Sequence, residues 1–246
     1  MGKVITVASG KGGTGKTTTV AAISSCLAAL GYKTLCIDFD TGLKNLDLSL
    51  CMTDFAVTDY MDIVSGHIPL MDACNASPSI SNLYFLAAPT VYDPNKLDPA
   101  MLIPMFDEIR QNFDYCLVDS PSGIDTGFRL AHTSADMSII VTTGEQPAMR
   151  DAQHIAVSVR DMGIRDLRLL VNRVMPGKLR IIHTTIDDVI DNIGVRLLGI
   201  VPEDSSVFFS LHDSVPLILY RKRRAAYDFL DAARRIAGEN VPLRQR

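Results

Sequence analysis

Residues 10–17 constrain this chain more than any other part of it. They are, in order, Gly10, Lys11, Gly12, Gly13, Thr14, Gly15, Lys16 and Thr17. This run fits the pattern G-x-x-x-x-G-K-[ST], in which a glycine-rich loop wraps its backbone around phosphate groups. An apolar, β-branched run at 4–8 precedes it, and an Ala-rich segment at 16–30 follows it. Because the motif has its meaning between a strand and a helix, we expect a phosphate-binding loop here rather than a structural glycine turn.

The chemistry of this loop predicts its ligand. Backbone N–H groups turned inward by the glycines attract phosphate oxygens, and the positive end of the helix dipole adds to the attraction. Lys16 should reach the β- and γ-phosphates, and the Thr17 hydroxyl should bind Mg²⁺. We therefore expect residues 10–18, Thr18 included, to bind ATP or ADP with Mg²⁺, and Lys16 to assist slow ATP hydrolysis.

Acidic residues at the ends of two apolar runs predict the rest of the catalytic site. The run 34–38 ends in Asp38, Asp40 follows two residues later, and the run 115–119 ends in Asp119. In a parallel sheet such strand ends face the ligand crevice. We expect Asp38 and Asp119 to hold the Mg²⁺ shell and Asp40 to orient the attacking water. The alternative for each is an ordinary strand-end acid or helix cap.

Two further strand ends are candidates for contact with a nucleotide base. Asn172 and Arg173 follow the run 167–171, and Pro202, Glu203 and Asp204 follow the run 197–201. The side-chain amide of Asn172 matches the donor and acceptor edge of adenine. All five residues are expected at the base, although turn formation explains the same residues equally well.

Short apolar runs alternate with helical segments along the chain, which is typical of a mostly parallel sheet covered on both faces. Expected strands lie at 4–8, 34–38, 83–87, 115–119, 138–142, 167–171 and 197–201. Expected helices lie at 16–30, 57–65, 99–112, 127–133, 148–162, 181–193 and 224–237. No linker long enough to separate two units interrupts this pattern. The fold class expected is therefore α/β: a single P-loop NTPase domain over residues 1–246, with a mostly parallel, twisted sheet and helices on both faces.

Composition points to the cytoplasm. The five cysteines lack any C-x-x-C spacing, so neither disulfides nor a cysteine metal site is expected. No window approaches the roughly eighteen apolar residues that span a bilayer, and the N-terminus lacks a signal-peptide pattern. We expect a cytoplasmic protein, with peripheral contact at the inner face of the cell membrane as the alternative.

Charge is distributed unevenly along the chain. Residues 221–246 carry eight Lys or Arg against three acidic residues, whereas the whole chain has a net charge of −4. A basic end of this kind suits an anionic partner such as DNA or a lipid headgroup. A solvated helix face explains the same charges.

The loop and the segments at the strand ends together resemble a known family. Residues 11–18 read Lys-Gly-Gly-Thr-Gly-Lys-Thr-Thr, the "deviant" Walker A form. Gly-Leu-Lys-Asn-Leu-Asp at 42–47, Arg-Asp-Ala at 150–152, Asn-Arg at 172–173 and Val-Pro-Glu-Asp at 201–204 extend the match. From residue 1 to about residue 242 the chain is similar to the MinD/ParA family of deviant Walker A P-loop ATPases, and within it to the MinD proteins.

This resemblance implies a molecular switch. ATP would be sandwiched in an ATP-dependent homodimer, and slow hydrolysis to ADP and phosphate would separate the subunits. Lys11 would cross the interface to the other subunit's nucleotide and act as an arginine finger does. The implied process is placement of the division site or a similar cellular positioning process, with protein partners of the MinC and MinE type.

Two features of the C-terminal part keep alternatives open. Family chains typically continue into a Lys-rich amphipathic segment. Residues 238–246 are too short and too poor in apolar residues to form one, which argues against membrane contact. The basic run 221–224 suits a partition-type ATPase that binds DNA non-specifically. A flagellar-number regulator of the same family is the third alternative.

Overall fold

All the strands expected from the sequence form, and one short additional strand joins them. The structure is a computed structural model that describes residues 1–246 except 43, 54–57, 91–92, 221–223 and 245–246. The strands are β1 (Lys3–Ala8), β2 (Thr34–Asp38), β3 (Asn75–Ala76), β4 (Leu83–Leu86), β5 (Tyr115–Asp119), β6 (Met137–Thr142), β7 (Asp166–Val174) and β8 (Arg196–Pro202). Because β7 extends past its expected end, Asn172 and Arg173 belong to the strand itself.

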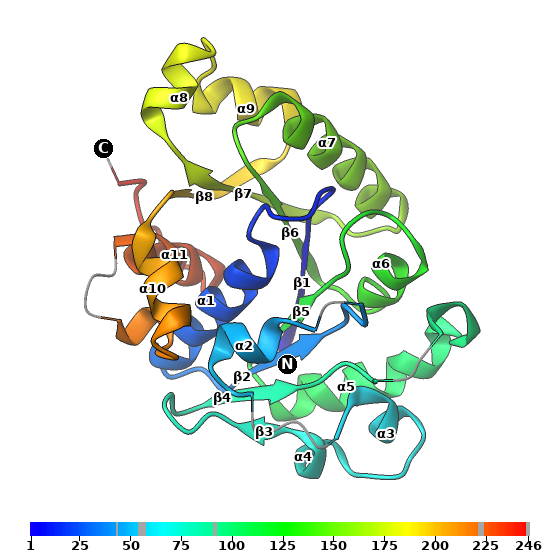
Figure 1. Cartoon of the computed structure of the whole chain (residues 1–246). Coiled ribbons are helices and arrows are strands. Elements are labelled where there is room, and N and C mark those ends of the chain that lie inside the picture. The colour runs from blue at the N-terminus through cyan, green and yellow to red at the C-terminus, as the bar shows by residue number, and fades with distance from the viewer. Residues whose placement is uncertain (43, 54–57, 91–92, 221–223, 245–246) are drawn as a thin grey trace.

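Within the described residues, eight strands form one sheet in the order β3-β4-β2-β5-β1-β6-β7-β8 (Figure 1). Neighbouring strands are parallel, except that β3 runs antiparallel to β4. β1 lies between β5 and β6. The earlier strands β2 to β5 lie on one side of β1 and the later strands β6 to β8 on the other, so the strand order reverses at β1. Ligand crevices form at the carboxyl ends of strands at such a switch point. The phosphate loop leaves the sheet at this position.

Helices cover both faces of the sheet, as the sequence predicted (Figure 1). They are α1 (Lys16–Ala29), α2 (Leu46–Leu50), α3 (Tyr60–Val64), α4 (Leu70–Ala73), α5 (Ile103–Asn112), α6 (Thr126–Ala131), α7 (Gln146–Asp161), α8 (Pro176–Ile181), α9 (Ile186–Ile193), α10 (Ser205–His212) and α11 (Arg224–Ile236). Short 3₁₀ turns connect some of them: η1 (Pro94–Lys96), η2 (Pro99–Leu102) and η3 (Leu217–Leu219).

Some helices differ from the sequence-based expectation for local reasons. The expected helix 99–112 begins as η2 and becomes α5 only at Ile103, since Pro104 is tolerated only in a first helical turn. The expected helix 181–193 is instead α8 followed by α9. Thr185 caps α9 by accepting a hydrogen bond from the Asp188 N–H, and Gly194, at φ 65°, ends it. The expected start at residue 57 and the basic residues 221–223 lie outside the described part of the chain.

Side chains of the central strands alternate between two apolar layers. Leu117 of β5 packs in the cluster that includes α1 and α11, whereas Cys116 and Val118 pack with α5 on the other face. A third cluster joins β6 and β7 to α7 and α9. Because these strands are buried on both faces, they are almost continuously apolar in sequence.

The five cysteines are free thiols. Burial raises the pKa of Cys36, in β2, to about 12, so this thiol stays neutral and packs as a small apolar side chain. Among the described helices, none combines the length and apolar character that crossing a bilayer requires.

His132 is a buried histidine at the end of α6. Its Nδ1 lies 2.8 Å from the Phe128 carbonyl oxygen and its Nε2 lies 3.2 Å from the Ser138 hydroxyl. Burial lowers the pKa of His132 to about 4, although the Phe128 carbonyl opposes that change. The imidazole is therefore neutral in the folded chain at pH 7.

This burial makes folding sensitive to acid. An unfolded histidine has a pKa of about 6.5, so between pH 6.5 and 4 the unfolded state binds a proton that the folded state excludes. The free energy of unfolding should fall over this range by up to about 3 kcal/mol. Urea titrations of His132→Gln at pH 7 to 4.5 should show a smaller loss than the intact chain. His154→Gln, which alters an exposed histidine, should change nothing; equal slopes in all three proteins would contradict the assignment.

Candidate nucleotide-binding site

The loop between β1 and α1 has the backbone that phosphate binding requires. Gly13 and Gly15 take left-handed φ angles of 81° and 87°. A Cβ atom on Gly12 or Gly13 would meet nothing within 4 Å, so their backbone faces open space. Gly15 is the N-cap of α1 and supplies no side chain to cap the first turn. The first amides of α1 are thus oriented toward an anion, together with the positive end of the helix dipole.

Lys16, the first residue of α1, is buried against the carboxylate at the end of β5. Its Nζ lies 2.6 Å from Asp119 Oδ1, and the two side chains are 6% and 1% exposed. Burial raises the pKa of the Asp119 carboxyl, while Lys16 and the Thr17 hydroxyl act to lower it. The ammonium group of the residue that follows the loop glycines is therefore held by a buried carboxylate.

A second buried carboxylate lies next to the first. The register of β2 and β5 pairs Asp38 with Asp119. Asp38 accepts hydrogen bonds from the Asp40 N–H at 2.8 Å and the Leu46 N–H at 3.4 Å. Burial, and then repulsion from Asp119, raise the pKa of Asp38 to about 7. A nearby cation would favour ionised forms of both acids, since it offsets the repulsion between them.

Asp40 follows the end of β2 rather than continuing the strand. One of its carboxylate oxygens accepts a hydrogen bond from the Gly42 N–H at 3.2 Å, and its own N–H binds Asp38. Asp40 also raises the pKa of Asp38 and of Asp119 electrostatically, so the three carboxyl groups share one region. The structure thus brings together Lys16, Asp38, Asp40 and Asp119, which come from three separate parts of the sequence.

On the other side of β1, the end of β7 supports the loop. The Asn172 side-chain amide donates to the Thr14 carbonyl oxygen at 2.9 Å. A Cβ on Gly15 would lie 2.2 Å from Asn172 Nδ2, so only glycine allows this approach. Arg173 donates to the Gly13 carbonyl oxygen at 2.9 Å and to Glu203 Oε2 at 2.8 Å. Arg173 holds a left-handed φ of 55°, which non-glycine residues adopt rarely and which its two partners help to maintain.

Pro202, Glu203 and Asp204, at the end of β8 and directly after it, make different structural contacts. Pro202 is the last residue of β8, and the Glu203 N–H donates to the Val174 carbonyl oxygen at 3.0 Å. Asp204 caps α10 through the Ser206 N–H at 2.9 Å and accepts from the Ala225 N–H at 2.8 Å. Both carboxylate oxygens of Asp204 therefore bind backbone amides, which joins the starts of α10 and α11.

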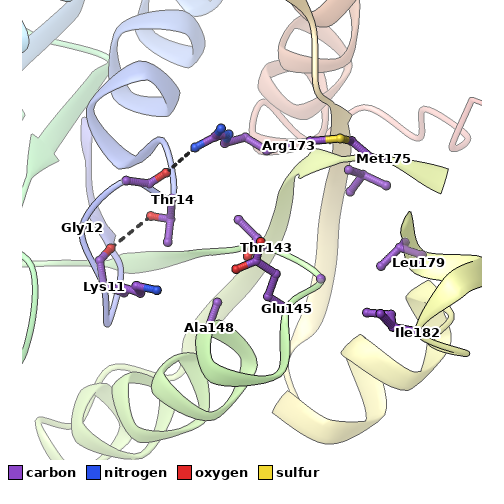
Figure 2. Close-up of a pocket in the computed structure, with 13 residues that line it drawn as sticks. Lys11, Gly12, Thr14, Thr143, Glu145, Ala148, Arg173, Met175, Leu179 and Ile182 are labelled. Carbon is purple, nitrogen blue, oxygen red and sulfur yellow. Dashed lines mark hydrogen bonds between the residues drawn. The ribbon is translucent and has the colours of Figure 1, made fainter. Parts of the chain in front are cut away.

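A cleft of about 300 Å³ borders the loop on the side of α7 and α8. Its lining includes Lys11, Gly12, Gly13, Thr14, Thr143, Gly144, Glu145, Ala148, Arg173, Val174, Met175, Leu179 and Ile182. Figure 2 shows the Lys11 side chain extending from the loop toward Thr143, Glu145 and Ala148. The volume is at the lower end of those of ligand pockets. The Lys11 side chain thus extends into the cleft on the α7 side of the loop.

Sequence reasoning missed two contacts of the loop. Glu145, after β6, lines the cleft and raises the pKa of Arg173 electrostatically, after Glu203. Asp151 of α7 packs on Gly10, where a Cβ would lie 2.5 Å from Asp151 Cβ and 2.9 Å from its backbone. Glu145 could have been found, because it follows a strand end as Asp119 does. The Gly10 contact has no sequence signal, since it depends on where α7 crosses the sheet.

Comparison with known proteins agrees with this geometry. A family model described as an AAA domain matches residues 2–167. The septum site-determining protein MinD of Bacillus subtilis is 36% identical over 246 residues, covering 99% of this chain and 92% of the relative. The chain belongs to the MinD family. Among solved structures, MinD in the MinC:MinD cell division protein complex of Aquifex aeolicus superposes with a TM-score of 0.88. It is 34% identical and the match covers 99% of this chain and 98% of that one.

A second solved structure bears directly on the ligand. MinD of Pyrococcus horikoshii, complexed with Mg-ADP, superposes with a TM-score of 0.83 at 28% identity, covering 96% of each chain. In the present MinD-family chain the residues fit the same group. The glycine loop leaves open space, the helix amides point at it, and a buried ammonium lies beside buried carboxylates. Mg²⁺ prefers one or two carboxylates together with phosphate oxygens, which is the donor set that this site offers.

The raised pKa of Asp38 predicts that its contribution to the free energy of unfolding falls as pH rises, whereas the contribution of His132 falls as pH is lowered. The folded chain keeps the Asp38 proton up to pH 7 or so, whereas an unfolded aspartate loses it near pH 4. The contribution of Asp38 to stability should therefore decline as pH rises from 4 to 7, by up to about 4 kcal/mol. Urea unfolding of the nucleotide-free chain and of Asp38→Asn at pH 5, 6, 7 and 8 measures this.

The expected result is that Asp38→Asn gains stability relative to the intact chain as pH rises. Asp187→Asn alters an exposed aspartate of α9 and should follow the intact chain throughout. Parallel curves for Asp38→Asn and the intact chain would show that Asp38 is ionised in the free protein.

Proposed function

We propose that this MinD-family chain is a Mg²⁺-dependent ATPase that acts in placement of the division site, with ATP bound by the loop 10–18. The observation that carries the proposal is the buried Lys16–Asp119 pair at the end of the central strands. A buried ion pair contributes little net stability compared with apolar packing, so its presence is better explained by the ligand. The site's polar groups and the MinD relationship support the same ligand.

The proposed roles follow from position. Lys16 moves from Asp119 to the β- and γ-phosphates when nucleotide enters, which leaves Asp119 for the metal side of the site. Thr17 supplies a hydroxyl, and Asp38 and Asp119 supply carboxylate oxygens, to the Mg²⁺ shell. The ion, when bound, neutralises the charge that develops on the phosphate oxygens. A bound cation would lower the pKa of Asp38, because a positive charge nearby favours the carboxylate.

Asp40 is proposed to orient the attacking water. It lies next to Asp38 but outside the strand, and its backbone N–H is anchored by the Asp38 carboxylate. Asn172, Arg173, Pro202, Glu203 and Asp204 are proposed to form the base side of the site. Of these, Asn172 and Arg173 also hold the loop carbonyls, so base contact and loop geometry are linked.

Lys11 supports a dimeric switch. Its side chain is exposed and extends into the cleft, so it is available to a second copy (Figure 2). We propose an ATP-dependent homodimer in which each Lys11 contacts the nucleotide of the other subunit. A cation supplied in this way accelerates phosphoryl transfer by roughly 10³–10⁵-fold.

The Aquifex aeolicus MinD was solved in complex with MinC. We propose that this chain likewise acts through a MinC-type partner, with a MinE-type activator, in the cytoplasm, with peripheral contact at the inner face of the cell membrane as the alternative. Partition-type ATPases share the fold, but one from Chlorobium tepidum is only 19% identical. The comparisons favour the MinD branch over DNA partition and over flagellar-number regulation.

Replacement of the loop lysine tests nucleotide binding. Lys16→Ala should weaken Mg-ADP binding roughly 100-fold or more, about 3 kcal/mol, because a buried charge–phosphate contact is lost. Isothermal titration calorimetry measures the affinity. Lys33→Ala is the matched control, because Lys33 precedes β2 at the opposite end of the sheet and packs over Tyr84 and Phe113. Unchanged binding by Lys16→Ala would contradict the loop assignment.

Replacement of Asp40 tests the switch. Asp40→Ala should bind ATP normally, hydrolyse it at least about 100-fold more slowly and accumulate as a dimer, because the water loses its orienting group. Light scattering with ADP and with ATP reports the mass, and phosphate release reports turnover. Lys11→Ala should bind ATP but stay monomeric. Normal hydrolysis by Asp40→Ala would mean that another group orients the water.

A further inference from the structure

The chain folds back on itself after α11. Residues 239–244, here called the C-terminal arm, leave α11 and return toward β8 (Figure 1). The Glu239 N–H donates to the Arg234 carbonyl oxygen at 2.9 Å, and the Glu239 carboxylate pairs with the Arg234 guanidinium at 2.7 Å. These contacts turn the arm away from the helix axis.

Arg235 of α11 joins the arm to the edge of the sheet. Its Nη1 donates to the Leu198 carbonyl oxygen of β8 at 2.9 Å. Its Nε and Nη2 donate to the carbonyl oxygens of Val241 and Pro242 at 2.9 and 2.8 Å. Since β8 is the last strand of the sheet, one guanidinium satisfies both an edge-strand carbonyl and the arm backbone.

Arg244 anchors the end of the arm in a pair of buried acids. It donates from Nε to Asp231 Oδ2 at 2.6 Å and from Nη2 to Asp231 Oδ1 at 3.1 Å. Its Nε lies 3.8 Å from Asp228 Oδ1. Asp228 and Asp231 are only 5% and 4% exposed. Buried carboxylates need positive charge nearby, and the arm supplies Arg244 in addition to Arg235 of the helix itself, which also interacts electrostatically with both acids.

Beside this anchor lies a cavity of about 250 Å³. Its apolar wall comes from β7, α8, α9 and β8 and consists of Val174, Pro176, Leu179, Ile186, Ile200 and Pro202. Asp228, Asp231, Arg235, Leu243 and Arg244 complete the lining. Leu243 remains 46% exposed, so the arm closes the cavity without filling it.

From these contacts we infer that the groove beside β8 binds an extended segment of a partner protein in which an apolar residue directly precedes an arginine. The C-terminal arm, whose Leu243 and Arg244 have this chemistry, is the intramolecular competitor of that segment. The apolar residue would enter the cavity, the arginine would pair with Asp231 and Asp228, and the backbone carbonyls would bind Arg235. The groove shares Pro202 with the residues proposed for the base side of the nucleotide site, but its charged residues are different ones, and the inference does not depend on how nucleotide binds.

Charge complementarity selects this kind of occupant. A neutral or acidic segment that displaced the arm would leave the buried Asp231 carboxylate without its bidentate partner Arg244, which is unfavourable. An arginine matches the bidentate geometry that Asp231 already makes, whereas a lysine would act only as a point charge. The edge of β8 offers backbone groups to an extended segment, a common mode of peptide recognition.

The test uses a fluorescein-labelled peptide with the sequence of residues 239–244, followed by fluorescence anisotropy with the intact chain and with Arg244→Ala. The intact chain should bind the peptide at least about tenfold more weakly than Arg244→Ala, because its own arm occupies the groove. Asp231→Asn, added to Arg244→Ala, should abolish the gain. Arg165→Ala alters an exposed arginine before β7 and should bind as the intact chain does.

A second peptide carries citrulline, an uncharged analogue, in place of arginine. It should bind Arg244→Ala at least about tenfold more weakly than the arginine peptide. Equal binding of the two peptides, or no gain in Arg244→Ala, would overturn the inference, provided that far-UV circular dichroism and Mg-ADP binding show a folded protein. A concentration-dependent dimer of the intact chain that Arg244→Ala abolishes would instead assign the groove to the arm of a second copy.

Discussion

The arrangement of this protein depends on one buried ion pair, Lys16 with Asp119. It joins the first residue of α1 to the last residue of β5, so the helix that follows the phosphate loop is fixed to the centre of the sheet. Two charges removed from water in this way need each other, because either alone would be strongly destabilising. The same requirement makes the pair responsive, since a phosphate group that attracts Lys16 leaves Asp119 in need of a cation. In the proposed function, a nucleotide bound with Mg²⁺ would meet both needs at once.

Electrostatic repulsion between buried carboxyl groups links Asp38 to the Lys16–Asp119 pair. Asp38 lies opposite Asp119 and carries a pKa raised to about 7, because burial and the neighbouring carboxylate disfavour its charge. In the proposed function, a divalent cation bound nearby would lower the pKa of Asp38 and so favour release of that proton. On the opposite side of β1, Asn172 and Arg173 hold the carbonyl oxygens of the same loop. The loop is thus supported from both halves of the sheet, and both halves can respond to its ligand.

At the β8 edge of the sheet, buried acidic residues are likewise paired with a cation. Asp228 and Asp231 are buried on α11 and are matched by Arg244, while Arg235 binds the edge of β8 and the C-terminal arm. Arg244 lies on a short terminal arm, so an arginine of another segment could replace it beside Asp231, whereas Arg235 is fixed in α11. For this reason the arm contacts differ from ordinary surface ion pairs, which contribute little.

Local chemistry in the sequence determined the parts of this protein that depend on neighbouring residues. The loop 10–17 between a strand and a helix, the acids at the ends of β2 and β5 and the alternation of strands with helices all follow from short-range patterns. Where Pro104 and Thr185 placed helix starts, a longer apolar pattern was misleading. Only the tertiary structure decided that Asp38 faces Asp119, that Asp151 packs on Gly10, that Asp204 joins two helices and that Arg244 reaches Asp231. These contacts depend on strand order and on where helices cross the sheet, which no single segment of the sequence specifies.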